Sequence, residues 1–224
     1  GLAPRERWIL SRLSHTTRAV NAAWESYRYD DGANQLYHFV WHTFCDWYLE
    51  LAKAETGGAE VRAVLRGVLL EALKLLHPVM PFITEEIASH LGHDDMLVVS
   101  RYPTPTLPWE DDGLEEDFGA LQDLVAGLRS YRALVGLAAR QAIEVTLVKG
   151  DPQRLDFLRG QADAIRQLAG TSMSTGSAPE HAVHELLGGV EVALSFPAGS
   201  IGEEQRARLG KEISALEREQ RAAE

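Results

Sequence analysis

The stretch from Leu36 to Lys53 constrains the fold most, because it is as aromatic as a protein core and yet charged along one side. At helical spacing its apolar stripe comprises Leu36, Val40, Phe44, Trp47 and Leu51, with Tyr37, Trp41 and Tyr48 beside it. The polar positions of the stretch are His38, His42, Asp46, Glu50 and Lys53. The pattern predicts a core helix with one polar face, in which Trp41 and Trp47 are packing residues.

Helical periodicity on either side of this stretch predicts further helices. One is expected from about Arg5 to Tyr27, with arginines opposite its apolar side, and another from about Ala59 to Leu76. His77-Pro78 should end the latter, since proline disfavours helix at the residue before it. Connections this short favour antiparallel neighbours, so the sequence predicts a mainly α fold built on an antiparallel helical bundle.

Capping residues predict where two of the helices begin. Asp30 or Asp31 is expected to cap the central helix, which should last until about Glu55. The Thr84 hydroxyl is expected to cap a short further helix that ends near Leu91. Together with the two flanking helices, these complete the predicted bundle.

The chain changes character after the bundle. An extended, proline-rich crossing from Met96 to Pro108 leads into the acidic run Glu110–Asp117 and then a helix to about Leu137. A small α/β subdomain should follow, with Gly188-Gly189 as a hairpin turn. Its expected elements are strands Ile143–Val148, Ala182–Leu187 and Val190–Phe196, a helix Asp151–Leu168, and a strand or loop over Thr171–Pro179. With a C-terminal helix at the end, the expected domains are residues 1–112, 113–198 and 199–224.

Composition gives the expected setting of the protein. Of its 224 residues 45% are apolar, which is normal for a globular protein that buries a core. No run is long enough to span a membrane, and the single Cys45 cannot form an internal disulfide. A reducing compartment, the cytoplasm, is therefore the expected location.

Charge is distributed unevenly along the chain. The formal net charge of −11 argues against a protein that coats nucleic acid non-specifically, because phosphate binding depends on lysine and arginine. The first residues are nevertheless basic, with Arg5, Arg7, Arg12, Arg18 and Arg28 against Glu6 and Glu25. A single local nucleic-acid footprint therefore remains compatible with the acidic average.

Sequence motifs for catalysis or for phosphate or metal binding are largely missing. No glycine-rich phosphate loop follows a strand. His42, Cys45 and Asp46 have a spacing that could hold a metal, but Cys45 is more simply a small core residue and His42 a surface residue. The carboxylate pairs Glu85-Glu86 and Glu115-Glu116 are interpreted as a helix first turn and a solvated face. We therefore predict neither catalytic residues nor a metal site, and keep a metal-dependent enzyme as a minor hypothesis.

Three segments carry a resemblance to a known family. ERWILSRL at Glu6–Leu13, FVWHTFCDWYLELAK at Phe39–Lys53 and LLHPVMPFITEEI at Leu75–Ile87 together resemble the anticodon-binding domain of valyl-tRNA synthetases. GGVEVALSFPAGSI at Gly188–Ile201 is similar to the entry into that family's C-terminal coiled-coil arm. The His-Ile-Gly-His and Lys-Met-Ser-Lys-Ser signatures of the family do not occur in the chain.

The resemblance implies a C-terminal fragment of a class I aminoacyl-tRNA synthetase, which should be inactive alone. The parent enzyme's catalytic domain would then be a partner and would use ATP and Mg²⁺, while this chain would need no cofactor. The implied nucleic-acid partner is valine tRNA, whose anticodon stem-loop the bundle would hold. Unstacked loop bases are read by hydrogen bonds and stacking, and the stem is held through its phosphates.

The residues expected to contact tRNA follow from this implication and from their charge. Arg5, Arg7 and Arg12 are candidates for backbone or base contacts, and His42, Asp46 and Lys53 for the anticodon-facing surface. Two further groups are phosphate candidates near the middle and the end of the chain, namely Arg129, Arg132, Arg206, Arg208 and Lys211. A solvated or ion-paired surface is the alternative for each of them. Trp41 and Trp47 could stack on a base, but core packing is the favoured role for both.

A different class of function stays open. The chain could be a stand-alone helical scaffold descended from such a domain, which binds protein through the acidic run and the last helix. Leu209, Ile213 and Leu216 give that helix an apolar seam that needs a partner. A returning helix would leave the protein a monomer, whereas a second copy would make it a dimer.

Overall fold

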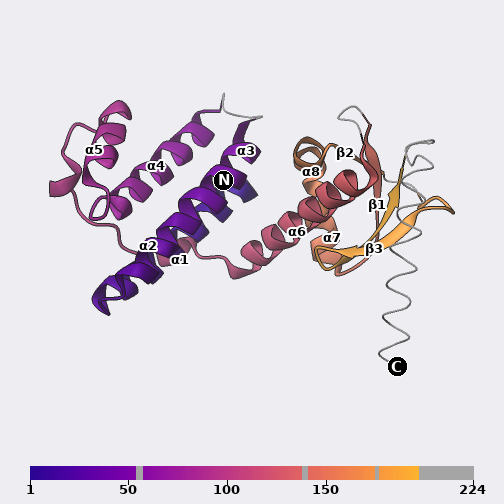
Figure 1. Cartoon of the computed structure of the whole chain (residues 1–224), viewed down its shortest axis with the longest axis horizontal. Helices are drawn as coiled ribbons and strands as arrows, with labels where there is room; N and C mark the ends of the chain where they lie inside the picture. Colours follow the sequence, from indigo (N-terminus) through magenta and orange to yellow (C-terminus); the bar gives the residue numbers. More distant parts are fainter. Residues whose placement is uncertain (54–57, 138–140, 175–176, 197–224) are drawn as a thin grey trace. The chain divides into compact units, whose positions relative to one another are not determined.

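The computed structural model describes residues 1–53, 58–137, 141–174 and 177–196. The chain divides into two compact units, Gly1–Glu116 and Asp117–Glu224, which are described separately below (Figure 1). The division falls inside one long helix, α6 (Asp112–Val135). Among the described residues, no helix combines the length and the apolar character needed to cross a membrane.

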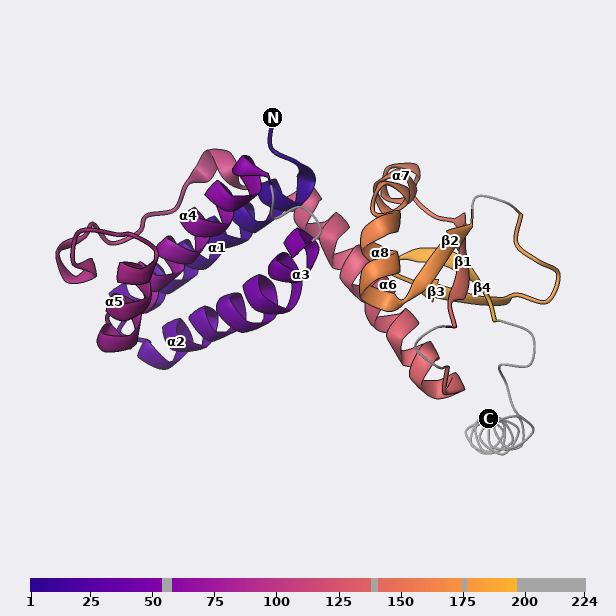
Figure 2. The same cartoon turned by 90° about the horizontal axis from the view of Figure 1, so that it is seen from above.

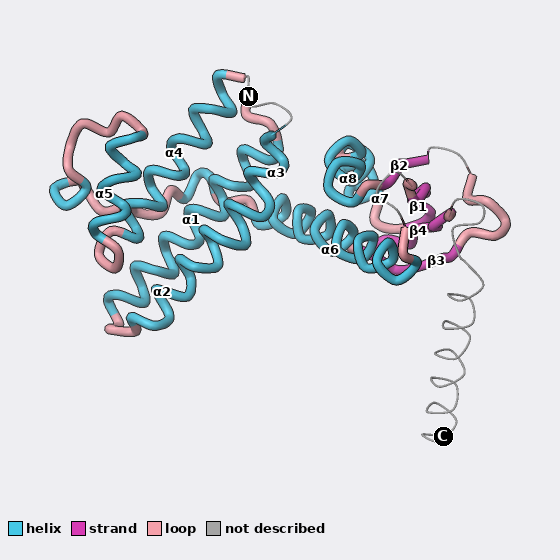
Figure 3. The backbone as a smooth tube through the Cα atoms, turned by 45° about the horizontal axis from the view of Figure 1, so that its top comes forward, coloured by secondary structure: helices cyan, strands magenta, loops and turns pink. Residues whose placement is uncertain are grey.

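The first unit is a helical bundle, as predicted. Helix α1 packs against α2, the π-helix η1 and α4, and α5 packs against α4 (Figure 3). The elements in chain order are α1 (Pro4–Glu25), α2 (Tyr29–Tyr37), η1 (His38–Tyr48), α3 (Leu49–Ala52), α4 (Ala59–Leu76), α5 (Pro81–His90) and the 3-10 turns η3 (Leu97–Val99) and η4 (Leu107–Trp109). The continuous segment α2–η1–α3 runs back along α1, the antiparallel arrangement that a short connection favours.

Two of the predicted caps are wrong. Helix α2 begins at Tyr29 after Arg28, so that Asp30 and Asp31 lie within its first turn, where their charges favourably meet the helix dipole. Helix α5 begins at Pro81, whose fixed φ and missing N–H suit the first helical position. Thr84 therefore lies inside α5, and its hydroxyl donates to the Met80 carbonyl at 2.8 Å.

The bundle core forms where α1, α2 and α4 meet. Val20, Leu36 and Leu75 are fully buried there, and the partly buried Trp24 and Tyr102 pack against them. The Trp24 indole donates to the Tyr102 hydroxyl at 2.8 Å, so the half-buried polar atoms of both rings are paired. A Cβ at position 32 would lie 2.4 Å from the Trp24 ring, and so only glycine lets α2 approach α1 this closely.

The central stretch departs from the predicted stripe. Because π-helical bonds join residue i to residue i+5, its turn is wider than that of an α-helix. The buried side chains of η1 are accordingly Phe39, Phe44 and Tyr48, spaced by five and four residues. Val40 and Trp47 are only half-buried, and Trp41 is 55% exposed. The prediction that Trp41 is a packing residue is therefore wrong.

The second unit is a small α/β fold. Its sheet has the strand order β2-β1-β4-β3, in which β1 and β2 are parallel and the other pairs antiparallel. Helices α6, α7 and α8 cover one face of this sheet (Figure 2). The elements after α6 are β1 (Ile143–Lys149), α7 (Pro152–Gly160), α8 (Ala162–Ala169), β2 (Thr171–Ser174), β3 (Val183–Leu187) and β4 (Val190–Ser195). The mainly α fold with a small α/β subdomain is confirmed.

Local sequence explains two features of this unit. Gly188 and Gly189 have φ of 59° and 73°, the left-handed values that a two-residue hairpin turn requires. The Asp151 side chain accepts the N–H groups of Gln153 and Arg154 and so caps α7. The helix predicted from Asp151 is, however, split at Gln161 into α7 and α8. The predicted C-terminal helix lies outside the described residues.

Candidate nucleic-acid interface

The exposed side of the η1 region carries a group of rings. We define the outer face of η1 as Tyr37, His38, Trp41, His42 and Asp46. Tyr37 and Trp41 are each 55% exposed. The His42 ring centroid lies 5.5 Å from that of Tyr37 and 5.4 Å from that of His38. Exposed flat rings of this kind can stack on unpaired bases, because every base has a π-face.

Asp46 adds a hydrogen-bond acceptor to the outer face of η1. Its Oδ2 lies 3.1 Å from His42 Nδ1, and both side chains are about half exposed. Cys45 beside it is half-buried, and burial, followed by the Asp46 charge, raises the pKa of its thiol. A raised pKa keeps the thiol protonated and unreactive. The described residues include no cluster of three or more His, Cys, Asp or Glu side chains able to hold a metal.

Arg5 and Lys53 lie near one end of η1 and α3. The Arg5 guanidinium donates to Glu6 at 2.7 Å and to the Leu51 carbonyl at 3.2 Å, and its side chain is only 14% exposed. It thereby joins the start of α1 to the end of α3, where carbonyls lack helical partners. Lys53 is 60% exposed and pairs with Glu50 one turn away. Of these two cations, Lys53 is the more accessible.

Part of the acidic run lies along α1, since Glu110, Asp111 and Glu115 contact that helix, whereas Asp112 and Glu116 are exposed. Glu110 accepts from Ser14 and Arg18, and Glu115 accepts from Ser11 and Arg12. Ser11 and Ser14 are buried, and their hydroxyls also accept backbone N–H groups from Asp111 and Thr106. We call this set of contacts the acidic seam. The expectation that Glu115 faces solvent is wrong, because its side chain is 13% exposed.

Two of the arginines predicted to contact tRNA form ion pairs within the acidic seam. Arg7 pairs with Asp111 at 2.5 Å, and Arg12 pairs with Glu115 at 2.8 Å. His15 lies 3.3 Å from Glu110 and 3.7 Å from Glu115. Hydrogen bonds from Arg18, and then Ser14, hold the pKa of Glu110 below its ordinary value. A phosphate that approaches Arg7 or Arg12 must therefore compete with a carboxylate already in place.

The remaining predicted cations belong to the second unit. Arg129 donates to the Leu168 carbonyl at 2.9 Å, and Arg132 donates to the carbonyls of Gln141 and Gly170 at 2.6 and 2.7 Å. Both guanidinium groups thus contact backbone carbonyls, at the end of α8 and just before β1, whereas the sequence suggested phosphates or neighbouring acids. Arg206, Arg208 and Lys211 lie outside the described residues.

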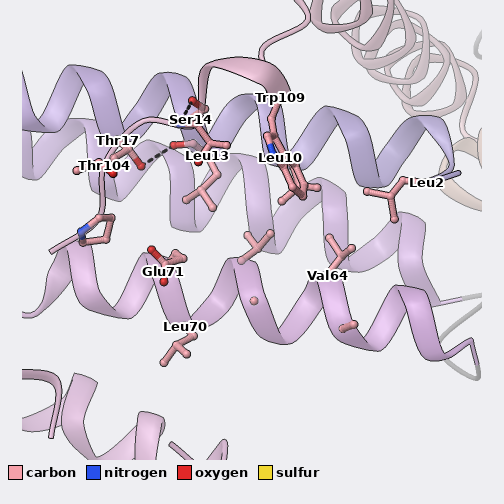
Figure 4. Close-up of a pocket in the computed structure, with 15 residues that line it drawn as sticks. Leu2, Leu10, Leu13, Ser14, Thr17, Val64, Leu70, Glu71, Thr104 and Trp109 are labelled. Atoms are coloured by element: carbon pink, nitrogen blue, oxygen red, sulfur yellow. Dashed lines mark hydrogen bonds between the residues drawn. The ribbon is translucent and has the colours of Figure 1, made fainter. Parts of the chain in front are cut away.

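An apolar groove runs between α1 and α4 in the first unit (Figure 4). Its volume is about 490 Å³, and Leu10, Leu13, Val64 and Trp109 are among its lining residues. Two of the polar groups that line it are already paired, since Thr17 donates to the Leu13 carbonyl and Ser14 donates to Glu110, both at 2.8 Å. The groove suits apolar side chains and offers little to a nucleic acid.

Sequence reasoning missed Tyr37 of the outer face of η1 and gave base stacking only as the less favoured role of Trp41. Tyr37 and Trp41 were grouped with the core because their positions adjoin the α-helical stripe. A signal was nevertheless present, since Tyr37, His38, Trp41 and His42 recur at one and four residues and so cluster on one side of a helix. Their histidines show that this side is not a core.

Comparison with known families assigns the chain to a class. The model for the anticodon-binding domain of tRNA ligases matches residues 6–147, which include the bundle from Glu6 onward and the outer face of η1. The chain belongs to this family of tRNA ligase anticodon-binding domains.

Within that class the similarity is to enzymes for one amino acid. The valine–tRNA ligase of Agrobacterium fabrum is 36% identical over 95% of this chain and 24% of its own length. Those of Nocardia farcinica and Enterococcus faecalis are 34% and 32% identical, over 97% and 96% of this chain. The resemblance to valyl-tRNA synthetases is confirmed. The chain spans about a quarter of the length of these relatives.

Proposed function

We propose that this chain binds the anticodon stem-loop of valine tRNA and so supports an aminoacylation performed elsewhere in a longer polypeptide. The observation that carries the proposal is the outer face of η1. It combines exposed rings with a carboxylate acceptor and lies inside the range that the family model matches. These are the groups that reading single-stranded bases requires.

Each residue has a distinct role in this proposal. Tyr37 and Trp41 stack on unpaired loop bases, and Asp46 accepts from a base amino group while it orients His42. Lys53 contacts a phosphate at the end of η1 and α3. Arg7 and Arg12 reach phosphates by exchanging their carboxylate partners, whereas Arg5 mainly positions α3. Arg129, Arg132, Arg206, Arg208 and Lys211 remain candidates for contact with other parts of the tRNA.

The chemistry of aminoacylation is assigned to residues that this chain does not contain. The relatives are named as ligases, and the chain spans about a quarter of their length. ATP and Mg²⁺ therefore act, in this proposal, in a catalytic partner domain. The chain itself contributes affinity and recognition, and takes no cofactor.

Titration of fluorescently labelled tRNA with the protein tests the proposal. Valine tRNA should bind, and the same tRNA with its anticodon replaced should bind more weakly, by about 1–3 kcal/mol for each base whose contact is lost. Affinity should fall between about 50 and about 150 mM salt, because phosphate contacts release counterions. Equal affinity for both tRNAs would contradict anticodon recognition, and no binding at the lower salt would remove the tRNA-binding role.

The alternative of a protein-binding scaffold loses part of its acidic surface. Glu110, Asp111 and Glu115 contact α1 within the same unit, so they do not form a free acidic patch. Its other support, the apolar seam of the last helix, lies outside the described residues. We therefore keep tRNA binding as the proposed function.

A further inference from the structure

Large apolar side chains are exposed around α5 in the first unit. Phe82 is 91% exposed, and Met96 and Val98 are 59% and 64% exposed. These three residues line one groove of about 410 Å³ together with His77, Pro81 and Glu85, which we call the α5 groove. Exposed apolar surface of this kind is unusual on a soluble protein unless something binds to it.

The wall formed by the segment after α5 is held rigidly. Both oxygens of the Glu85 carboxylate accept the Leu97 N–H, at 3.1 and 3.0 Å. The Leu97 side chain is buried against Leu73 and Ala88, so η3 is fixed to α5. Met96 and Val98 flank this buried residue and are consequently turned outward. Their exposure follows from the anchoring of Leu97 and does not reflect a loose loop.

The opposite end of the groove is fixed as well. The Thr84 hydroxyl donates to the Met80 carbonyl at 2.8 Å, so its oxygen is left to accept from His77 Nδ1 at 2.9 Å. This contact ties the start of α5 to the end of α4. A groove whose walls are already in place loses little entropy when a partner enters it, and binds more tightly for that reason.

Charge decides which kind of partner fits. Glu86 lines the groove with its side chain 70% exposed, and the exposed Asp94 and Asp95 directly precede Met96. His90 lies 3.6 Å from Glu86, but carboxylates outnumber it on this side, and the resulting acidic rim repels RNA phosphates. It also disfavours a second copy of the chain, because a two-fold contact would place the same acids opposite one another. An apolar surface with lysine or arginine beside it is complementary.

We propose that the α5 groove binds a basic amphipathic helix of a protein partner. Apolar side chains of that helix, recurring at three- and four-residue spacing, contact Phe82, Met96 and Val98. Its lysine and arginine side chains face Glu86, Asp94 and Asp95. This interaction is separate from the proposed tRNA binding, since none of these residues belongs to the outer face of η1.

Two synthetic peptides test the proposal. One is a labelled amphipathic helix with leucines on one face and lysines beside them, and the other has glutamates in place of the lysines. Fluorescence anisotropy should show saturable binding of the basic peptide alone. Phe82→Ser should weaken that binding at least about tenfold, as loss of a central aromatic anchor does at interfaces. Glu86→Lys should weaken it in low salt. Phe82→Ser leaves the net charge unchanged, so its tRNA binding should equal that of the original protein.

Control measurements make the outcome decisive. Leu186 in the second unit is 73% exposed, so Leu186→Ser removes a comparable apolar side chain and should leave peptide binding unchanged. Equal binding of both peptides, or an equal loss in Leu186→Ser, would overturn the proposal. So would Phe82-dependent binding of a single-stranded uridine oligomer, or a dimer in light scattering that Phe82→Ser abolishes. Phe82 is exposed, so its substitution should leave the thermal melt of the protein unchanged.

Discussion

Residues on the two sides of η1 have separate roles. Phe39 is 1% exposed and Tyr48 is fully buried, whereas Tyr37 and Trp41 are more than half exposed. The Tyr48 hydroxyl and the second oxygen of Glu6 are both buried with no hydrogen-bond partner among the described residues. Burial, and then the Glu6 charge, raises the pKa of Tyr48, so this hydroxyl stays neutral. The buried side therefore holds the bundle together, and the outer face is free to bind.

Paired alanine substitutions test this division. Phe39→Ala should lower the free energy of unfolding by about 3–5 kcal/mol, because it removes a ring from the core and leaves a cavity. Trp41→Ala should change that free energy little and weaken tRNA binding by about 1–3 kcal/mol, the range for one lost stacking contact. Urea unfolding and tRNA titration of both variants measure these quantities. The division is wrong if Trp41→Ala destabilises the protein as much as Phe39→Ala does.

At the scale of elements, local signals predicted boundaries best where they involve proline or glycine. Helix α4 spans Ala59–Leu76 as predicted, because proline at position 78 ends it. The hairpin at Gly188-Gly189 is equally local. The π-helical turn of η1 has no comparable sequence signal, since its side chains are compatible with an α-helix as well as a π-helix. A stripe drawn at α-helical spacing therefore misplaced Trp41.

Contacts between elements that are distant in the chain could not be predicted from the sequence. The acidic run looked like a solvated or protein-binding face because its partners lie about a hundred residues earlier, at Ser11 and Ser14. Likewise, the alternation of apolar and polar residues predicted β1 and β4 as strands. It did not predict that β2 pairs with β1 on the side away from β4. Pairing of this kind depends on tertiary packing and leaves no periodic signal in one segment.

The acidic seam should make unfolding depend on pH. The folded protein holds the pKa of Glu110 below its ordinary value of about 4.5, since Arg18 and Ser14 donate to the carboxylate. Its stabilisation is therefore complete above that value and is lost as the pH falls through the lower folded-state pKa. Glu110→Gln should lower stability at neutral pH and differ less from the original protein in acid.

Urea unfolding at about pH 7 and about pH 4 measures this difference. Glu60→Gln is the matched control, because Glu60 is exposed in the first turn of α4 and outside the acidic seam. That variant should keep the pH dependence of the original protein. If Glu110→Gln were equally destabilised at both pH values, the carboxylate charge would not be the stabilising group.

At the scale of the whole molecule, the proposed tRNA binding would join an acidic protein to an acidic ligand with few cations available. The net charge is −11, and the acidic seam pairs Arg7, Arg12 and Arg18 with carboxylates. Affinity for tRNA should therefore depend on the exposed rings of η1 more than on phosphate contacts. A logarithmic plot of affinity against salt should have a slope of only about −2 to −3, against about −10 for a strongly electrostatic binder.

Neutralising the acidic seam should change that slope. In the triple variant Glu110→Gln, Asp111→Asn and Glu115→Gln, Arg7 and Arg12 no longer have carboxylate partners in the seam, so phosphates bind them without competition. Affinity for tRNA at low salt should rise, and each additional phosphate bound by an arginine should steepen the slope by about 0.7–0.9.

A control that replaces the exposed Glu25, Asp30 and Glu60 by their amides changes the net charge equally, away from the seam. Because net charge acts at long range, both variants should bind faster, but only the seam variant should show a steeper slope. Equal slopes in the two variants would show that Arg7 and Arg12 do not contact the tRNA.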